Sequence, residues 1–172
     1  MLIYLDPIFG RNGTLNNPFL IIAFLLLFPC LTQAATLTAQ VIAITDGDTI
    51  TVLTPAKQQI KVRLADIDAP ELRDQPYGRK AKQVLSDKIY RKQVAVLQVS
   101  IDRYQRLVGR IFLDGRNINA EMVADGAAWV YRKYSDDTKL LELERQAREE
   151  GRGLWGLQED QRVAPWEWRK EN

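Results

Sequence analysis

Residues 49–71 read TITVLTPAKQQIKVRLADIDAPE and predict two β-strands joined by a turn, followed by an abrupt change of direction. β-Branched and aliphatic residues fill 49–53, and a turn is indicated at Pro55–Gln58. Apolar and polar residues then alternate through residues 60–65, a period of two that is typical of a strand with one buried face. The alternation breaks at 66–68 and Pro70 follows, so we expect the chain to bulge or leave the sheet there.

Three further strands are indicated outside this segment, at residues 37–44, 94–99 and 107–113, and the Asp46-Gly47 turn predicts a hairpin between 37–44 and 49–53. Helices are predicted from Pro76 onward, around 118–123 ahead of Gly126, and near the C-terminus, where Ser135 or Asp136 would cap the helix. Five strands with short turns favour a mainly β domain with α: a five-stranded barrel of the OB type with about three packed helices. We expect one domain over residues 36–172.

The N-terminus has a different character. Residues 19–28 are an apolar run of ten, and small or polar residues follow as far as Ala34 and Ala35. This pattern predicts a signal peptide over residues 1–35 and export to the periplasm or the extracellular space, because a bilayer span needs about 20 apolar residues. The alternative is an uncleaved anchor over residues 19–31. Cleavage would remove Cys30, the only cysteine, so no disulfide is expected in the mature chain.

Composition limits the chemistry. The 172 residues include no histidine, and the formal net charge is +2. The commonest general base and the commonest transition-metal ligand are therefore both missing. A balance this mild does not identify a nucleic-acid binder by itself. Catalysis, if any, must use carboxylates, guanidinium groups, hydroxyls, amines or a metal that prefers oxygen ligands.

Carboxylates gather in two short segments. Asp46 and Asp48 flank a glycine, and Asp66, Asp68 and Glu71 surround a proline. The first segment can be read as an ordinary hairpin turn and the second as a solvated loop. If the barrel brings the two loops together, their carboxylates would repel one another and favour a bound cation, Ca²⁺ or Mg²⁺ over zinc.

Two arginines accompany these carboxylates. Arg63 precedes the second acidic segment and Arg106 precedes the fifth strand. A guanidinium group matches two phosphate oxygens, so two of them beside a divalent cation would outline a phosphodiester site. Surface ion pairs are the alternative for both.

In this order the motifs resemble the staphylococcal nuclease (thermonuclease) family. They are Asp46-Gly47-Asp48-Thr49, Arg63-Leu64 with Asp68-Ala69-Pro70-Glu71, Asp102-Arg103-Tyr104-Gln105-Arg106, and Leu113-Asp114-Gly115. The similarity extends over residues 38–157. It implies an OB-fold and a Ca²⁺-dependent nuclease that hydrolyses DNA and RNA to 3′-phosphorylated products. Substrates with single-stranded or unpaired regions, a monomer and no obligate protein partner are expected.

The resemblance also assigns roles by position. Asp48, Asp68 and the Ala69 carbonyl match the family's calcium ligands. Arg63, Glu71 and Arg106 match its catalytic residues, and Tyr104 and Tyr134 are the candidates for stacking on a base.

The chain departs from the family pattern at two positions. Gln105 stands where the family often has glycine, and Arg132 stands where a family member has a nucleotide-contacting tyrosine. If the loop needs φ > 0 at residue 105, glutamine would cost about 1 kcal/mol or shift Arg106. A non-catalytic OB-fold module that binds nucleic acid, and an exported interaction domain with an ion-pair network, are the alternative functions.

Overall fold

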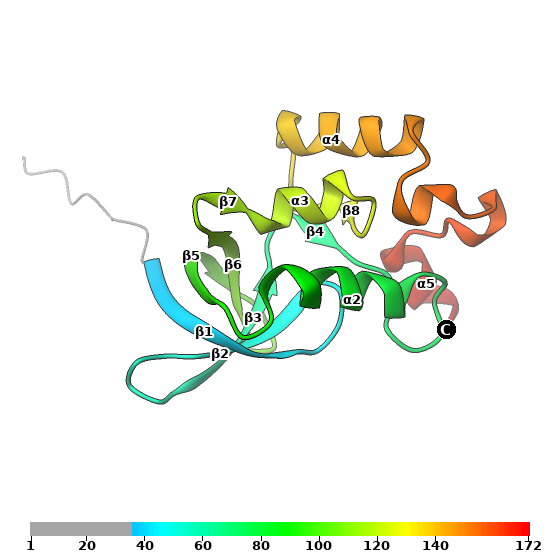
Figure 1. Ribbon diagram of the computed structural model, residues 1–172. Coiled ribbons are helices and arrows are strands. Elements are labelled where there is room, and N and C mark those ends of the chain that lie inside the picture. The colour runs from blue at the N-terminus through cyan, green and yellow to red at the C-terminus, as the bar shows by residue number, and fades with distance from the viewer. Residues whose placement is uncertain (1–35) are drawn as a thin grey trace, which may run out of the picture. The chain divides into compact units, whose positions relative to one another are not determined.

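The computed structural model describes residues 36–172, and its centre is a closed β-barrel (Figure 1). Strand order is β3-β2-β1-β5-β6-β7, and a parallel pairing of β3 with β6 closes the cylinder. The five barrel strands are β1 (Thr36–Ile44), β2 (Thr49–Leu53), β3 (Gln59–Leu64), β5 (Gln93–Ile101) and β6 (Leu107–Leu113). The predicted five-stranded OB-type barrel is confirmed.

The β2–β3 hairpin has the register that its alternation predicts. Thr49 pairs with Arg63 and Val52 with Ile60. Every second side chain is buried in the barrel: Ile50, Val52, Val62 and Leu64. Burying an aliphatic side chain of this size contributes about 1.5–3 kcal/mol. Because a slip of one residue would turn this apolar set outward, the core fixes the face on which Arg63 lies.

The chain leaves the barrel after β3, as predicted. Asp66 has φ +68°, and the next two residues form β4 (Ile67–Asp68), which pairs with β8 (Trp129–Val130) in a separate two-stranded sheet. The buried amide of Asn119 fixes this departure, because it donates to the carbonyls of Ala65 (2.9 Å) and Gly109 (3.3 Å). A short strand, β7 (Arg116–Asn117), extends the main sheet beyond β6.

Within residues 36–172 four helices accompany the barrel, one more than the three expected. They are α2 (Gly78–Ile89), α3 (Ile118–Ala124), α4 (Thr138–Glu149) and α5 (Pro165–Glu171). Short 3₁₀ turns at Gly153–Gly156 and Glu159–Gln161 connect α4 to α5. Helix α2 begins two residues later than predicted, after Tyr77 in a left-handed conformation with φ +72°.

The predicted cap of the last long helix was wrong by one or two positions. The N-cap of α4 is Asp137, not Ser135 or Asp136. Its carboxylate accepts from the backbone N–H groups of Lys139 and Leu140, so it satisfies two donors of the first turn. Sequence patterns define such ends only to within a few residues when several capping residues stand in a row.

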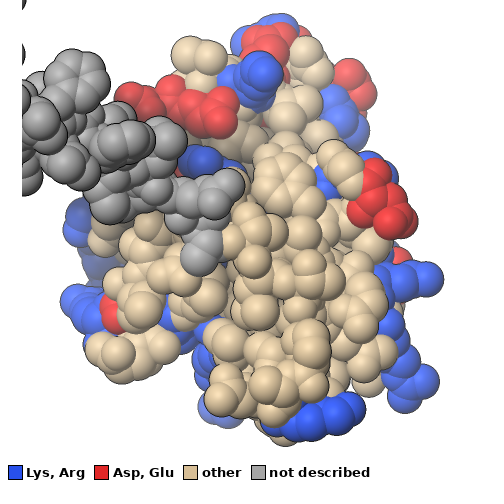
Figure 2. All heavy atoms as spheres, turned by 90° about the vertical axis from the view of Figure 1, so that its left-hand side faces the viewer, with Lys and Arg blue, Asp and Glu red and all other residues tan. Residues whose placement is uncertain are grey.

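Charged side chains are unevenly distributed over the surface. On the face in Figure 2, uncharged residues fill most of the centre and Lys and Arg lie along the margins. No helix within residues 36–172 is long and apolar enough to cross a membrane. The predicted signal peptide, the alternative anchor and Cys30 lie outside the described residues.

Candidate active site

The two acidic loops lie directly against each other because Gly47 has no side chain. A Cβ atom at residue 47 would lie 2.6 Å from the Cβ of Ala69 and 2.8 Å from the Cβ of Ala81 in α2. Gly47 does not have a positive φ, so close packing accounts for it better than a turn requirement. The approach lets the Ala69 N–H donate to Oδ2 of Asp48 at 2.7 Å.

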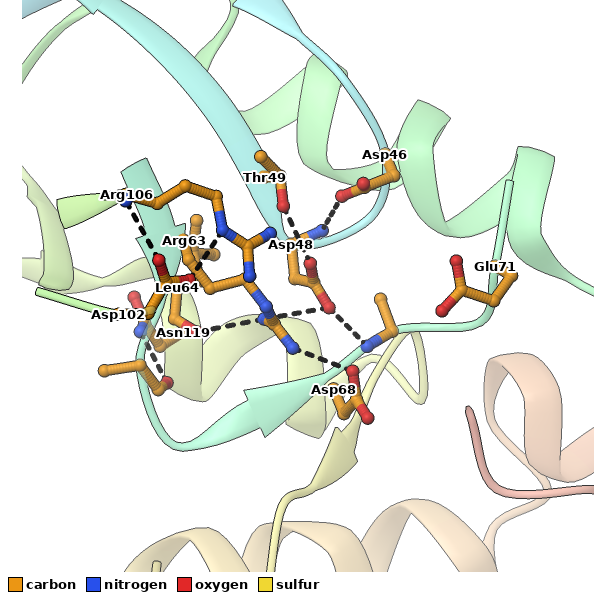
Figure 3. Close-up of polar contacts among 12 residues, drawn as sticks. Asp46, Asp48, Thr49, Arg63, Leu64, Asp68, Glu71, Asp102, Arg106 and Asn119 are labelled. Carbon is orange, nitrogen blue, oxygen red and sulfur yellow. Dashed lines mark hydrogen bonds and ion pairs between the residues drawn. The ribbon is translucent and has the colours of Figure 1, made fainter. Parts of the chain in front are cut away.

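Arg63 joins the two predicted calcium carboxylates (Figure 3). Its Nη1 lies 2.9 Å from Oδ2 of Asp48, and its Nη2 lies 2.7 Å from Oδ1 of Asp68. Nη1 also donates to the Leu64 carbonyl at 3.1 Å. Asp48 is 6% exposed and Asp68 1% exposed. Two carboxylates from separate segments and one guanidinium thus form a single buried cluster, and their roles as calcium ligands stay a prediction.

Burial sets the electrostatics of this cluster. Loss of solvent raises the pKa of Asp48 to about 8, against the opposing attraction of Arg63. Burial also raises the pKa of Asp68, although hydrogen bonding to Arg169 and the charge of Arg63 oppose the shift. Carboxylates that are costly to ionise without a nearby positive charge favour the binding of a cation.

The cluster is smaller than the acidic pocket that the sequence suggested. Among residues 36–172, no three Asp or Glu side chains converge on one point. The Asp66 carboxylate points away from the cluster, with its Oδ2 2.7 Å from Nε of Arg110. The Asp46 carboxylate accepts a hydrogen bond from the backbone N–H of Asp48 at 3.0 Å. The donor set of two buried carboxylates suits a hard cation rather than zinc, and Ca²⁺ takes 6–8 oxygen ligands, so water or phosphate oxygens would complete the shell.

Glu71 lies beside this cluster in the loop before α2. Its side chain is 41% exposed, and its Oε1 accepts from Nη1 of Arg169 at 2.6 Å. The other terminal nitrogen of Arg169 donates to Oδ2 of Asp68 at 2.7 Å. Sequence reasoning missed Arg169, because 98 residues separate it from Glu71 and no local pattern connects them. The basic pair Arg169-Lys170 at the chain end was the only signal.

Arg106 is held at the start of β6 by Asp102. Its Nε lies 2.7 Å from Oδ2 of Asp102, and its backbone N–H donates to Oδ1 at 2.9 Å. The parallel register places Val108 opposite Arg63, and Arg106 stands two residues before Val108, just ahead of β6. Gln105 has φ +60°, so residue 105 is in the left-handed conformation, and a residue with a side chain carries backbone strain there.

The two candidate stacking tyrosines lie on different loops. Tyr104 is 64% exposed in the β5–β6 connection, where the guanidinium groups of Arg103 and Arg106 approach its ring at 4.9 and 5.5 Å. Tyr134 is 65% exposed after β8 and packs edge-on against Tyr131, with 4.8 Å between ring centroids. Neither ring joins the ion-pair cluster. Their role in stacking on a base stays a prediction.

Fold and site together define a small barrel domain that carries a cluster of buried carboxylates bridged by an arginine. Comparison with known proteins identifies the class. Residues 61–157 match the family model for staphylococcal nuclease homologues. The chain belongs to the staphylococcal nuclease family and is a nuclease, whose substrate is nucleic acid.

Relatives that match most of the chain include two whose names describe a nuclease. The chain is 40% identical over 159 residues to a Haemophilus influenzae protein named "Uncharacterized endonuclease", with 91% of this chain and 88% of that protein covered. It is 42% identical over 142 residues to a Shigella flexneri protein named "Micrococcal nuclease", covering 76% and 79%. It is also 42% identical over 149 residues to "Protein ParB" of Escherichia coli, covering 80% and 82%.

Proposed function

We propose that the protein is a Ca²⁺-dependent phosphodiesterase that hydrolyses DNA and RNA with little sequence preference and leaves 3′-phosphorylated products. The observation that carries the proposal is the pair of buried carboxylates, Asp48 and Asp68, joined by one guanidinium group. Their oxygens, with the Ala69 carbonyl, are the atoms that would hold the cation. When bound, Ca²⁺ would polarise the scissile phosphate.

The side chains of the chain itself supply the remaining chemistry. Arg63 and Arg106 neutralise the negative charge that develops on the phosphate oxygens. Glu71 accepts a proton from the water that attacks phosphorus. The bond from phosphorus to the 5′ oxygen breaks, the 5′ oxygen takes up a proton, and the phosphate stays on the 3′ side.

A basic hollow next to the site favours a polynucleotide substrate. It lies between the loop that follows Glu71 and helix α2, and its lining includes Arg73, Arg79 and Lys82 together with one acid, Asp74. No ion pair holds these three cations within the described part of the chain. Cations that are free to pair with phosphates bind the backbone without reading sequence. We infer a preference for single-stranded or unpaired regions, whose flexible backbone can bring its phosphates to these cations, and a monomeric enzyme.

One assay tests the proposal. The purified protein is incubated with plasmid DNA and with RNA, in Ca²⁺, Mg²⁺, Zn²⁺ or excess chelator. We expect Ca²⁺ to support cleavage, Mg²⁺ to support it poorly because it demands tighter octahedral geometry, and Zn²⁺ to fail. Full activity in chelator would refute the metal assignment, and binding without cleavage would indicate a non-catalytic module.

Variants test the side chains. Glu71→Gln should lower turnover by about 10²–10⁴, the usual weight of general-base catalysis. Arg63→Lys keeps the charge but loses the planar fork, so it should cost about 2–4 kcal/mol of transition-state stabilisation. Arg106→Lys should behave similarly. Arg145→Gln, in which only the exposed ion pairs with Glu142 and Glu149 on α4 are lost, is the matched control and should keep full activity.

We also infer export. The support is the apolar run at residues 19–28 and the small residues that end at Ala35. Mature protein should begin near residue 35 or 36 in the periplasm or the medium. N-terminal sequencing of protein recovered outside the cytoplasm checks this. Intact Met1 in the membrane pellet would favour the anchor at residues 19–31 instead.

A further inference from the structure

The loop that carries Glu71 is tied to the C-terminal end of the chain through its main chain. The Glu71 N–H donates to Oε1 of Gln75 at 2.8 Å, and Nε2 of Gln75 donates to the Val163 carbonyl at 2.7 Å. Gln75 is buried. Because a buried amide with both ends bonded has little freedom, it fixes the loop against residues 163–171, which we call the C-terminal segment.

A second link joins the same partners through side chains. The guanidinium of Arg169 lies between two carboxylates, 2.6 Å from Oε1 of Glu71 and 2.7 Å from Oδ2 of Asp68. Asp68 is fully buried and is also held by Arg63. Arg169 therefore connects a half-exposed glutamate to a carboxylate whose position is already fixed. A planar fork with two carboxylate partners restricts both of them in distance and in orientation.

The backbone of α5 is itself firmly placed. Trp166 stacks on Tyr131 with ring centroids 5.3 Å apart and planes 3° from parallel, and it meets Trp129 edge-on at 5.9 Å. Trp129 is the partner of Asp68 in the β4–β8 ladder. Figure 1 shows α5 beside the loop between β4 and α2. Aromatic packing thus positions Arg169 relative to the strand that carries Asp68.

We propose that Arg169 is a positioning residue for the nuclease reaction, and that the C-terminal segment completes the active site. Arg169 holds the Glu71 carboxylate at the place where it accepts the proton of the attacking water. This inference rests on the proposed role of Glu71. It extends beyond the region that matches the family model, because that region ends at residue 157.

Steady-state kinetics of three variants separate positioning from other roles. Arg169→Gln should lower kcat by about 10–100-fold with KM for DNA changed less than about twofold, because a catalytic group displaced by 1 Å can cost about 10² in rate. Arg169→Lys should recover part of the loss. Lys170→Gln is the matched control, since it removes the neighbouring charge on the same helix, where Lys170 pairs with Glu167 and with no other acid of residues 36–172. It should keep the wild-type kcat.

A double-mutant cycle identifies the group through which Arg169 acts. If it acts through Glu71, Arg169→Gln should cause no further loss of rate in the Glu71→Gln background. An independent readout is the melting temperature in excess chelator. The sum of the decreases in melting temperature of the two single variants should exceed the decrease of the double variant. If Arg169→Gln does not fold, Arg169→Lys takes its place in both cycles.

Each contrary result has a distinct meaning. If Arg169→Gln lowers the rate equally in the wild-type and Glu71→Gln backgrounds, the positioning role is overturned. If it raises KM at unchanged kcat, the positioning role is overturned in favour of simple electrostatic attraction of nucleic acid. Wild-type kinetics of Arg169→Gln together with an inactive Glu71→Gln would overturn this inference alone. A fully active Glu71→Gln would overturn the general base of the proposed function, and this inference with it.

Discussion

Gly47→Ala should damage both the stability and the activity of the enzyme through one added methyl group. The new Cβ would meet Ala69 at 2.6 Å and Ala81 at 2.8 Å, where ordinary contact begins near 3.4 Å. Ala69 and Ala81 are both buried, so the loop itself must move by about 0.6–0.8 Å. Overpacking of this kind typically costs about 1–3 kcal/mol. The 2.7 Å hydrogen bond from Ala69 N–H to Asp48 would lengthen, and displacement near 1 Å at a catalytic group can cost about 10² in rate.

Urea denaturation and initial rates of DNA cleavage measure the two effects. Gly115→Ala is the control, because Gly115 has φ +78° and no atom within 4 Å of an added Cβ. This variant should lose about 1 kcal/mol through backbone strain and keep its activity. Wild-type stability and rate in Gly47→Ala would refute the claim that Gly47 is needed for the approach of the two loops.

Three further outcomes are expected. Gln105→Gly should raise the free energy of unfolding by up to about 1 kcal/mol in a urea titration, because glycine tolerates φ +60°, and a loss of stability would contradict the strain. Calcium affinity measured by calorimetry should increase between pH 5 and 8, because the raised pKa of Asp48 leaves a proton on the folded protein that competes with the cation. In chelator the free energy of unfolding should decrease over the same pH range, because the folded state must then give up a proton that the unfolded state has already lost. The triple variant Arg73→Gln/Arg79→Gln/Lys82→Gln neutralises the basic hollow and should leave kcat on a dinucleotide-sized substrate unchanged. The salt dependence of its binding to long single strands should fall by up to about three released ions. An unchanged dependence of affinity on salt would show that the hollow does not contact the substrate.

The barrel could be predicted from the sequence because its signals are local. Alternation within 49–64 sets the hairpin and its inward face, and all five strands occur where the pattern placed them. Helix α5 was missed because seven residues carry little helical periodicity. Its stability comes from Trp166 packing on Tyr131, 35 positions earlier in the chain, and no window of sequence contains that contact.

The residues of the candidate site likewise divide into those joined by short-range contacts and those joined only by the fold. Arg63 and Asp68 are five residues apart, and Arg106 and Asp102 four, so a short motif presents both ion pairs. The contact between Asp48 and Ala69 spans 21 residues and required the fold to become visible. Asp66 was grouped with Asp68 by proximity, but the left-handed turn at Asp66 directs its carboxylate to Arg110 instead.

Arg169 has the largest sequence separation from its partners in the site, 101 residues from Asp68 and 98 from Glu71. The match to the family model, residues 61–157, includes Glu71 but not Arg169, the residue proposed to hold its carboxylate. Glu71 is exposed on one side and stands in a loop without regular structure, so its orientation depends on an external partner. If Arg169 positions Glu71 as proposed, a relative without an equivalent segment needs another group for this task. On that proposal, nucleases that share the same motifs can differ in rate through the C-terminal segment.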